Sequence, residues 1–160
     1  MSRELVVRRA TVADVGACRG IVEGLPTHFT PDVPDRLVAD LARCDAWVLD
    51  RGDEVVGCCV VERRDRAADV RWIAVAAPER GHGLGRAMLA RVLHELRAGG
   101  VAVVTAWTLD PAAGYAPYEA TRAFWSAMGF VPIATIEPTP EWSPGSPAAC
   151  YVAALAATVP

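Results

Sequence analysis

The sequence contains no lysine, so all sixteen of its fixed cations are arginine. A phosphate-binding loop of the Walker A type requires Gly-Lys-Ser/Thr, and the absence of lysine excludes that loop. The net charge of the chain is −3, and the sequence lacks the basic stripe that is typical of nucleic-acid-binding proteins. We therefore expect no nucleic-acid partner.

The sequence also lacks a cysteine pattern and long apolar runs. The five cysteines are odd in number and include no C-x-x-C pair, which argues against a disulfide framework or a zinc site. We predict free thiols, mostly buried, and no metal ligands. The N-terminus lacks the apolar stretch of a signal peptide, and no run approaches about 18 apolar residues. These absences predict a cytoplasmic protein that does not engage a membrane.

What the sequence does contain is sufficient for one folded domain over residues 1–160. The apolar fraction is 52% and the charged fraction is 22%, as in globular proteins. No internal repeat or long linker divides the chain. Hydrophobic periodicity and turn residues predict alternating strands and helices, and therefore an α/β fold. Strands are predicted at 5–9, 46–50, 55–62, 69–75, 101–108, 130–136 and 149–155, helices at 11–23, 34–41, 84–98 and 118–128, and turns at 51–54 and 63–68.

The segment Arg80-Gly81-His82-Gly83-Leu84-Gly85 lies directly between a predicted strand and a predicted helix. The first amides of a helix have no internal partners, and the helix dipole is positive at that end. Glycines allow a ligand to approach the backbone closely. This context predicts a pyrophosphate site. The spacing differs from the G-x-G-x-x-G loop that opens a dinucleotide-binding fold.

Two segments resemble the GNAT superfamily of N-acetyltransferases. Arg80-x-x-Gly83-x-Gly85 is similar to the R/Q-x-x-G-x-G/A signature of motif A, and residues 121–130 resemble the A-x-x-F-Y-x-x-x-G-F helix of motif B. The element order agrees over the whole chain, whereas the specific likeness covers residues 69–130. The resemblance implies an acyl-CoA N-acyltransferase fold, with a mixed, mostly antiparallel sheet of six to seven strands, about four helices, and a splay between strands four and five.

The resemblance also implies an activity: transfer of acetyl from acetyl-CoA to a primary amine of a small molecule or peptide, by direct attack in a ternary complex. Acetyl-CoA would be a co-substrate, and no metal would take part. A longer acyl-CoA donor and a non-catalytic acyl-CoA-binding or regulatory module are the alternatives. A monomer or a homodimer is expected.

The acyl-CoA contacts implied by the resemblance lie in three places. The fourth strand would pair with the pantetheine arm, the glycine-rich loop would hold the pyrophosphate, and motif B would face the sulfur. A backbone amide near the end of the strand would meet the oxyanion. The residues concerned are Ile73, Ala74, Val75, Arg80, Gly81, His82, Gly83, Leu84, Gly85, Arg86 and Trp125.

Trp125 stands where the family usually has a tyrosine that protonates the departing thiolate or touches its sulfur. An indole N–H donates a hydrogen bond but is not an acid near neutral pH. Either Tyr115 or Tyr118 reaches the sulfur instead, or the thiolate, whose thiol has a pKa of about 8.5, leaves without an acid. Packing at the mouth of the site is the alternative role for both tyrosines.

Asp69 and Glu62 are the candidate general bases. Asp69 matches an acidic position often seen in relatives, although a solvated strand-end carboxylate would look the same in sequence. His28, in the loop that often covers the acceptor in this family, is expected at the surface. Trp142, in the Pro-rich loop 138–147, is expected to anchor that loop or to close over the substrate.

Overall fold

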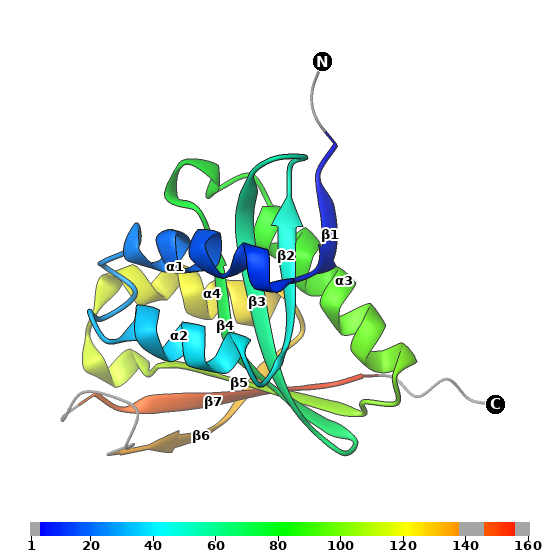
Figure 1. Ribbon diagram of the computed structural model, residues 1–160. Coiled ribbons are helices and arrows are strands. Elements are labelled where there is room, and N and C mark those ends of the chain that lie inside the picture. The colour runs from blue at the N-terminus through cyan, green and yellow to red at the C-terminus, as the bar shows by residue number, and fades with distance from the viewer. Residues whose placement is uncertain (1–3, 138–145, 156–160) are drawn as a thin grey trace.

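A seven-stranded sheet in the order β1-β2-β3-β4-β5-β7-β6 organises the computed structural model, which describes residues 4–137 and 146–155 (Figure 1). All neighbouring strands are antiparallel except β4 and β5, which are parallel. This is the mixed, mostly antiparallel sheet predicted from the resemblance. The strands are β1 Val6–Arg9, β2 Asp45–Asp50, β3 Val55–Arg64, β4 Ala67–Val75, β5 Val103–Leu109, β6 Val131–Ile136 and β7 Ala148–Ala154.

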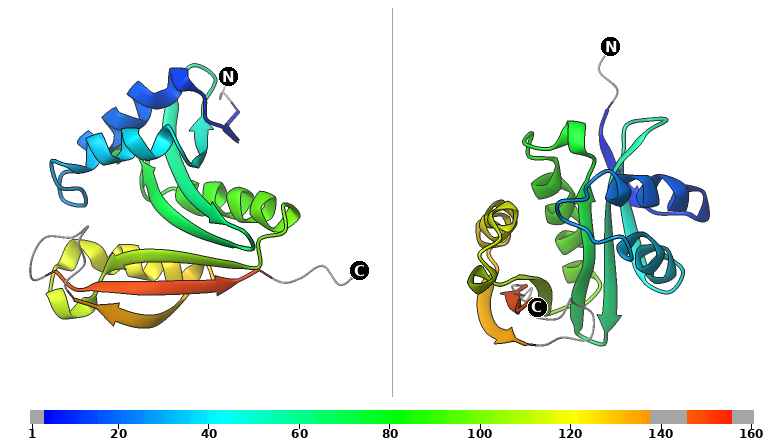
Figure 2. Two further views of the ribbon diagram at one scale, coloured as in Figure 1. Left: turned by 60° about the horizontal axis from the view of Figure 1, so that its bottom comes forward. Right: turned by 90° about the vertical axis from the view of Figure 1, so that its left-hand side faces the viewer.

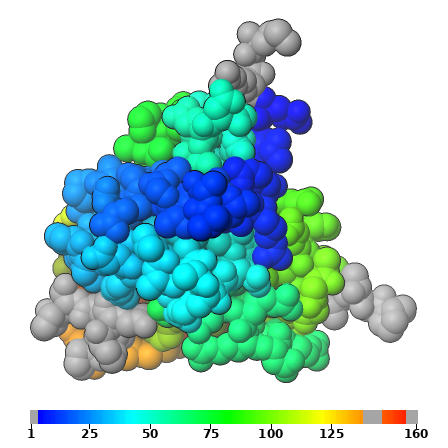
Figure 3. Space-filling model, in the orientation of Figure 1, coloured from blue at the N-terminus to red at the C-terminus, as the bar shows by residue number. Residues whose placement is uncertain are grey.

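Four α-helices cover the two faces of the sheet. Helices α1 (Val15–Glu23) and α2 (Val33–Leu41) lie on one face, and α3 (Leu84–Ala98) and α4 (Glu119–Ala127) lie on the other (Figure 2). In the space-filling view, α1 and α2 cover the front of the molecule (Figure 3). Within the described residues, no helix is long and apolar enough to cross a bilayer.

Side chains alternate between two hydrophobic cores because successive residues of a strand face opposite sides of the sheet. Trp47 and Cys59 belong to the core under α3 and α4, together with Met88 and Leu89. Val48, the neighbour of Trp47, belongs to the second core, under α1 and α2. The helical periodicity and strand alternation read from the sequence therefore correspond to real burial.

A β-bulge in β4 changes this alternation at a functionally important point. Val70 pairs with Val61 of β3 and Trp72 pairs with Val60, so that Arg71 is the additional residue. Val70 and Trp72 are consequently in different cores, although they are two residues apart. The last β4–β5 pair, Val70 with Ala106, lies at the same level. Beyond it the two halves of the sheet diverge, as Figure 2 shows.

The turn predicted at 63–68 is wrong in its extent. β3 continues to Arg64 and β4 begins at Ala67, so only Asp65 and Arg66 make the turn. Asp65 has a φ of 54°, a backbone conformation that Asp tolerates better than most residues. Arg63 and Arg64 extend the ladder against alanines, and this long-range pairing outweighs their weak preference for a strand.

All five cysteines are free thiols, as predicted, and only Cys44 is partly exposed. Within the described residues, no group of three or more His, Cys, Asp or Glu side chains is arranged to hold a metal ion.

Candidate active site

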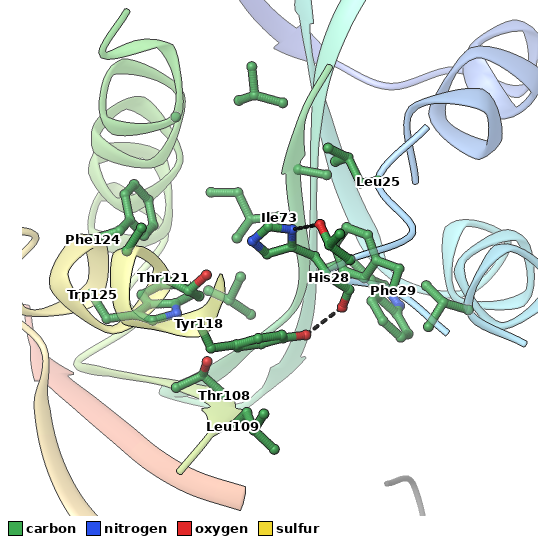
Figure 4. A pocket seen from close by; sticks show the side chains of 18 of the residues that line it. Leu25, His28, Phe29, Ile73, Thr108, Leu109, Tyr118, Thr121, Phe124 and Trp125 are labelled. Carbon is green, nitrogen blue, oxygen red and sulfur yellow. Dashed lines mark hydrogen bonds between the residues drawn. The ribbon is translucent and has the colours of Figure 1, made fainter. Parts of the chain in front are cut away.

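A cleft of about 1320 Å³ opens where β4 and β5 separate. The segment between α1 and α2 forms one wall, and α4 and the N-terminus of α3 form the other (Figure 4). Among the residues singled out from the sequence, the cleft brings together the β4 segment, most of the glycine-rich loop, Asp69, both candidate tyrosines and Trp125. Glu62 and His82 are not among its lining residues.

The glycine-rich loop forms one end of the cleft. Gly81 and Gly83 have φ values of 84° and 76°, and a Cβ at either position would meet no protein atom within 4 Å. Gly83 is the N-cap of α3, so the amides that follow, starting with Leu84, lack intrahelical acceptors. The loop is supported from outside by Arg51, which donates to both carboxylate oxygens of Glu79 at 2.8 and 2.5 Å. These features fit a bound pyrophosphate.

One edge of β4 is open inside the cleft. Ile73, Ala74 and Val75 pair with β3 on their other side, whereas β5 pairs with β4 only as far as Val70. The backbone groups on the open edge are therefore placed to bind an extended chain, as in the addition of a strand to a sheet. The sequence resemblance implied a pantetheine arm at this edge, and that contact stays a prediction.

Trp125 lies on the inner wall of the cleft and is almost fully buried, with 3% of its surface exposed. Its ring packs edge-to-face against Phe130 at a centroid distance of 4.9 Å and against Phe124 at 5.2 Å. The tryptophan thus fills the core below the cleft as well as lining it.

Tyr115 and Tyr118 both lie at the cleft and both bind the segment between α1 and α2. The Tyr115 hydroxyl donates to the carbonyl of Thr27 at 2.9 Å, and the Tyr118 hydroxyl donates to the carbonyl of His28. Burial raises the pKa of Tyr118 to about 12, so its hydroxyl remains protonated. Two successive carbonyls are thereby tied to the loop that precedes α4.

His28 differs from the expectation of a surface residue, because it is half-buried in the cleft near Ile73 (Figure 4). Its Nδ1 and Nε2 atoms lie 3.4 and 3.5 Å from the two terminal nitrogens of Arg80. Burial, and secondly the charge of Arg80, hold the pKa of His28 below 6.5, although the carbonyl of Pro117 acts in the opposite direction. The imidazole is therefore neutral at pH 7. The sequence gives no signal for this contact, which joins residues 52 positions apart.

The two candidate bases are separated by the structure. Asp69 lines the cleft and accepts a hydrogen bond of 2.6 Å from Thr105 on β5. Glu62 pairs with Asp69 across the β3–β4 ladder, but its carboxylate accepts a hydrogen bond of 3.1 Å from Arg43 at the end of α2. Glu62 and Arg43 line a separate surface depression. The structure thus places Asp69, and not Glu62, at the cleft.

Sequence reasoning missed Thr108, the penultimate residue of β5. It lines the cleft and only 2% of its surface is exposed. Among the described residues, its Oγ1 is the one buried side-chain oxygen or nitrogen without a hydrogen-bond partner. A threonine within an apolar strand gives no sequence signal, because its significance lies in the missing partner. The predicted role of Trp142 lies outside the described residues.

Comparison with known proteins gives a consistent result at the level of family and fold. A family model described as "Acetyltransferase (GNAT) domain" matches residues 42–132. A crystal structure from Desulfovibrio desulfuricans, described as a GNAT-family acetyltransferase, is 25% identical, with a TM-score of 0.83, and the match covers 96% of this chain and 100% of that one. A search of curated proteins found no match.

Two more distant structures share the fold. The ribosomal-protein-S18-alanine N-acetyltransferase of Escherichia coli is 18% identical, with a TM-score of 0.76 and 94% of each chain covered. Ard1 of Thermoplasma volcanium is 19% identical, with a TM-score of 0.77, and 95% of this chain and 98% of that one are covered. The family model spans more than half of the sequence and includes the β4 edge, the glycine-rich loop and α4. The chain belongs to the GNAT acetyltransferase family.

Proposed function

We propose that the protein transfers an acetyl group from acetyl-CoA to a primary amine of a small molecule or peptide. The observation that carries this proposal is the continuity of the cleft, which joins the anion-binding loop at residues 80–85 to the open β4 edge at residues 73–75. A ligand that ends in a pyrophosphate and continues as an extended, amide-containing arm matches both parts.

The residues present fit acetyl-CoA in charge as well as shape. The loop offers unpaired amides at the N-terminus of α3, and Arg80 and Arg86 supply positive charge beside them. Gly81 and Gly83 leave the space next to the backbone open. In this proposal the β4 edge binds the pantetheine amides, and an amide near Val75 donates to the oxyanion.

The proposed reaction is a direct attack in a ternary complex. The acceptor amine, after losing a proton, uses its lone pair to form a bond to the thioester carbon. The carbonyl oxygen takes the displaced electron pair and is stabilised by the backbone donor. The attacking nitrogen then carries an extra proton, which it loses to the general base or to water. When the carbonyl re-forms, the carbon–sulfur bond breaks and its electron pair leaves on sulfur. The products are an amide and coenzyme A.

Asp69 is the proposed general base, because it lines the cleft and its carboxylate is oriented by Thr105. His28 is a second candidate, since it lies in the cleft beside Ile73 and is neutral at pH 7. The two differ in position: Asp69 lies where β4 and β5 are still paired, whereas His28 approaches from the loop opposite. Substituting Asp69 and His28 one at a time therefore shows which of them acts as the base.

The acceptor side of the cleft is bounded by Phe29, Trp72 and Trp107. Phe29 and Trp72 pack edge-to-face at 6.4 Å, and Asp40 accepts a hydrogen bond of 2.7 Å from the Trp72 indole, which fixes that ring. This wall is compatible with an amine that carries apolar groups. We propose a cytoplasmic enzyme that acts as a monomer or homodimer. Transfer from a longer acyl-CoA and pure acyl-CoA binding are the alternatives.

The deciding experiment is release of coenzyme A from acetyl-CoA across a panel of amines: amino acids, polyamines, aminoglycosides and peptides with free N-termini. Turnover with one amine class supports the proposal and excludes a pure binding module. Replacing acetyl-CoA with longer acyl-CoA donors in the same assay determines the chain length. Binding of acetyl-CoA without turnover of any amine would favour the regulatory module.

A further inference from the structure

Thr108 lies at the point in the cleft where β5 has left β4. The last β4–β5 pair involves Ala106, two residues earlier, whereas on the opposite edge Thr108 still pairs with Ala149 of β7. The residue is therefore held by the sheet on one side and faces the splay on the other. Its backbone is therefore fixed by β7, although the residue lines the cleft.

Within residues 4–137 and 146–155, the hydroxyl of Thr108 is buried without a hydrogen-bond partner. Burying a hydroxyl without such a partner is unfavourable, and native structures contain few such groups. Valine has nearly the same shape and would fill this position at no such cost. The lone hydroxyl, at a residue that lines the cleft, therefore indicates a partner that arrives with the ligand.

The neighbours of Thr108 identify the part of the ligand concerned. Thr108 lies beside Tyr118 at the same end of the cleft as Trp125 (Figure 4). The Tyr118 hydroxyl is already bonded to the His28 carbonyl, and the indole of Trp125 is not an acid. Among these three side chains, only Thr108 has a hydroxyl that is not already hydrogen-bonded to a described residue.

We infer that Thr108 Oγ1 donates a hydrogen bond to the sulfur of the bound thioester and stabilises the departing thiolate. The inference rests on the proposed acetyl transfer. As the carbon–sulfur bond breaks, its electron pair stays on sulfur and the hydrogen bond strengthens. The hydroxyl keeps its proton, since it is a much weaker acid than the thiol. The thiolate leaves unprotonated and is protonated later by water.

The first test compares three variants in steady-state kinetics at saturating amine. Thr108→Val should lower kcat by about 10- to 100-fold, the value of one hydrogen bond to a charged group, with less than a threefold change in acetyl-CoA affinity. Thr108→Ser keeps the hydroxyl and should retain kcat within about fivefold. Thr135→Val is the matched control, because Thr135 Oγ1 donates to Asp110 at 2.6 Å on an exposed strand. It should leave both parameters unchanged.

A second readout responds to the sulfur itself. A hydrogen bond to the thiolate lowers the pKa of the thiol. The thiol of coenzyme A bound to the wild type, titrated by the ultraviolet absorbance of its thiolate, should have a pKa at least about one unit below that of the Thr108→Val complex. A purely structural threonine would not change this value.

The outcomes separate this inference from the proposed function. Failure of the wild type to bind acetyl-CoA or to turn over any amine would refute the proposed function. If the wild type is active, an unchanged kcat and an unchanged thiol pKa in Thr108→Val overturn the role of Thr108 alone. Weaker acetyl-CoA binding with an unchanged kcat also overturns it, because the hydroxyl would then bind the pantetheine arm rather than the sulfur.

Discussion

The Tyr118 hydroxyl donates a hydrogen bond to the backbone carbonyl of His28, which ties the segment before α4 to the segment between α1 and α2. Tyr115 makes the parallel contact with the carbonyl of Thr27. These segments lie about 90 residues apart in the sequence and belong to opposite walls of the cleft. The tyrosines thus connect the two walls of the cleft.

This contact predicts a structural role for the Tyr118 hydroxyl. Tyr118→Phe should lower the free energy of unfolding by about 1 kcal/mol and change kcat less than threefold at saturating acetyl-CoA. Tyr115→Phe should lower the free energy of unfolding by a smaller amount, because Tyr115 is 42% exposed. Urea denaturation and steady-state kinetics measure the two effects. A fall in kcat of about 10²-fold in either variant would instead identify that tyrosine as an acid.

The glycine-rich loop predicts a loss of cofactor binding in Gly83→Val. Acetyl-CoA should raise the melting temperature of the wild type, since it binds only the folded state. The valine side chain would occupy the open space beside the α3 amides and abolish that shift. Differential scanning fluorimetry with and without acetyl-CoA provides the measurement.

Gly100→Val is the matched control for the loop. Gly100 has a φ of 88° and, like Gly83, has no protein atom near its Cβ position, but it does not line the cleft. Both variants should lose stability from backbone strain, whereas only Gly83→Val should lose the acetyl-CoA shift. If Gly83→Val proves too unstable, the corresponding alanine pair preserves the comparison. If acetyl-CoA raises the melting temperature of folded Gly83 variants as much as that of the wild type, this loop does not bind the pyrophosphate.

The proposed base predicts a pH-dependent defect in Asp69→Asn. We expect kcat/KM to fall by about 10²-fold at pH 7 and by much less at pH 9.5, where more of the amine is already deprotonated. Glu62→Gln should resemble the wild type at both pH values, because Glu62 lies outside the cleft. The pH profile of kcat/KM decides between the two carboxylates.

His28→Gln tests the second candidate. If the imidazole is the base, the kcat/KM of the wild type should fall as the pH drops through the lowered pKa of His28, below 6.5. The pH profile of His28→Gln should lack this decrease. A defect in His28→Gln together with normal activity in Asp69→Asn would transfer the role of base to His28. Normal activity in both would leave the free-amine fraction and water as the explanation.

Asp14 predicts a stability change with pH that is unrelated to catalysis. Its carboxylate accepts bonds of 2.8 and 2.9 Å from Arg8, and one of 2.7 Å from the amide of Thr11. The Arg8 bonds hold the pKa of this buried carboxyl well below its ordinary value. Because the folded-state pKa is lowered, the stabilisation is complete above about pH 4, begins to decline below it, and is lost only as the pH falls through the folded-state pKa.

Asp14→Asn should therefore lower the free energy of unfolding by about 2–3 kcal/mol at pH 7 and by somewhat less at pH 3, where the decline has begun but the folded carboxylate is still charged. Asp35→Asn is the control, since Asp35 forms an ion pair with Arg19 on the surface, where its side chain is 80% exposed. That variant should lose less than about 1 kcal/mol. Urea denaturation at both pH values provides the comparison. Equal losses at pH 3 and pH 7 would contradict the assignment of the effect to the carboxylate charge.

Local patterns in the sequence determined the elements and the position of the glycine-rich loop. Strand alternation, helical periodicity and the glycines at positions 81 and 83 act over a few residues, so the order of the elements was readable. The loop at residues 80–85 was recognisable for the same reason, because it lies between a strand and a helix that can each be predicted. The likeness of residues 69–130 to motifs A and B then indicated the family.

Tertiary structure alone decided which polar groups meet in the cleft. Asp69 and Glu62 were both candidate bases in the sequence, but Arg43, just after α2, binds Glu62 outside the cleft, whereas Asp69 lines it. His28 meets Arg80 across 52 residues, and the hydroxyl of Thr108 is notable only because no described residue forms a hydrogen bond with it. Such facts depend on contacts between distant segments, and one residue of register or one β-bulge reverses the face on which a side chain lies.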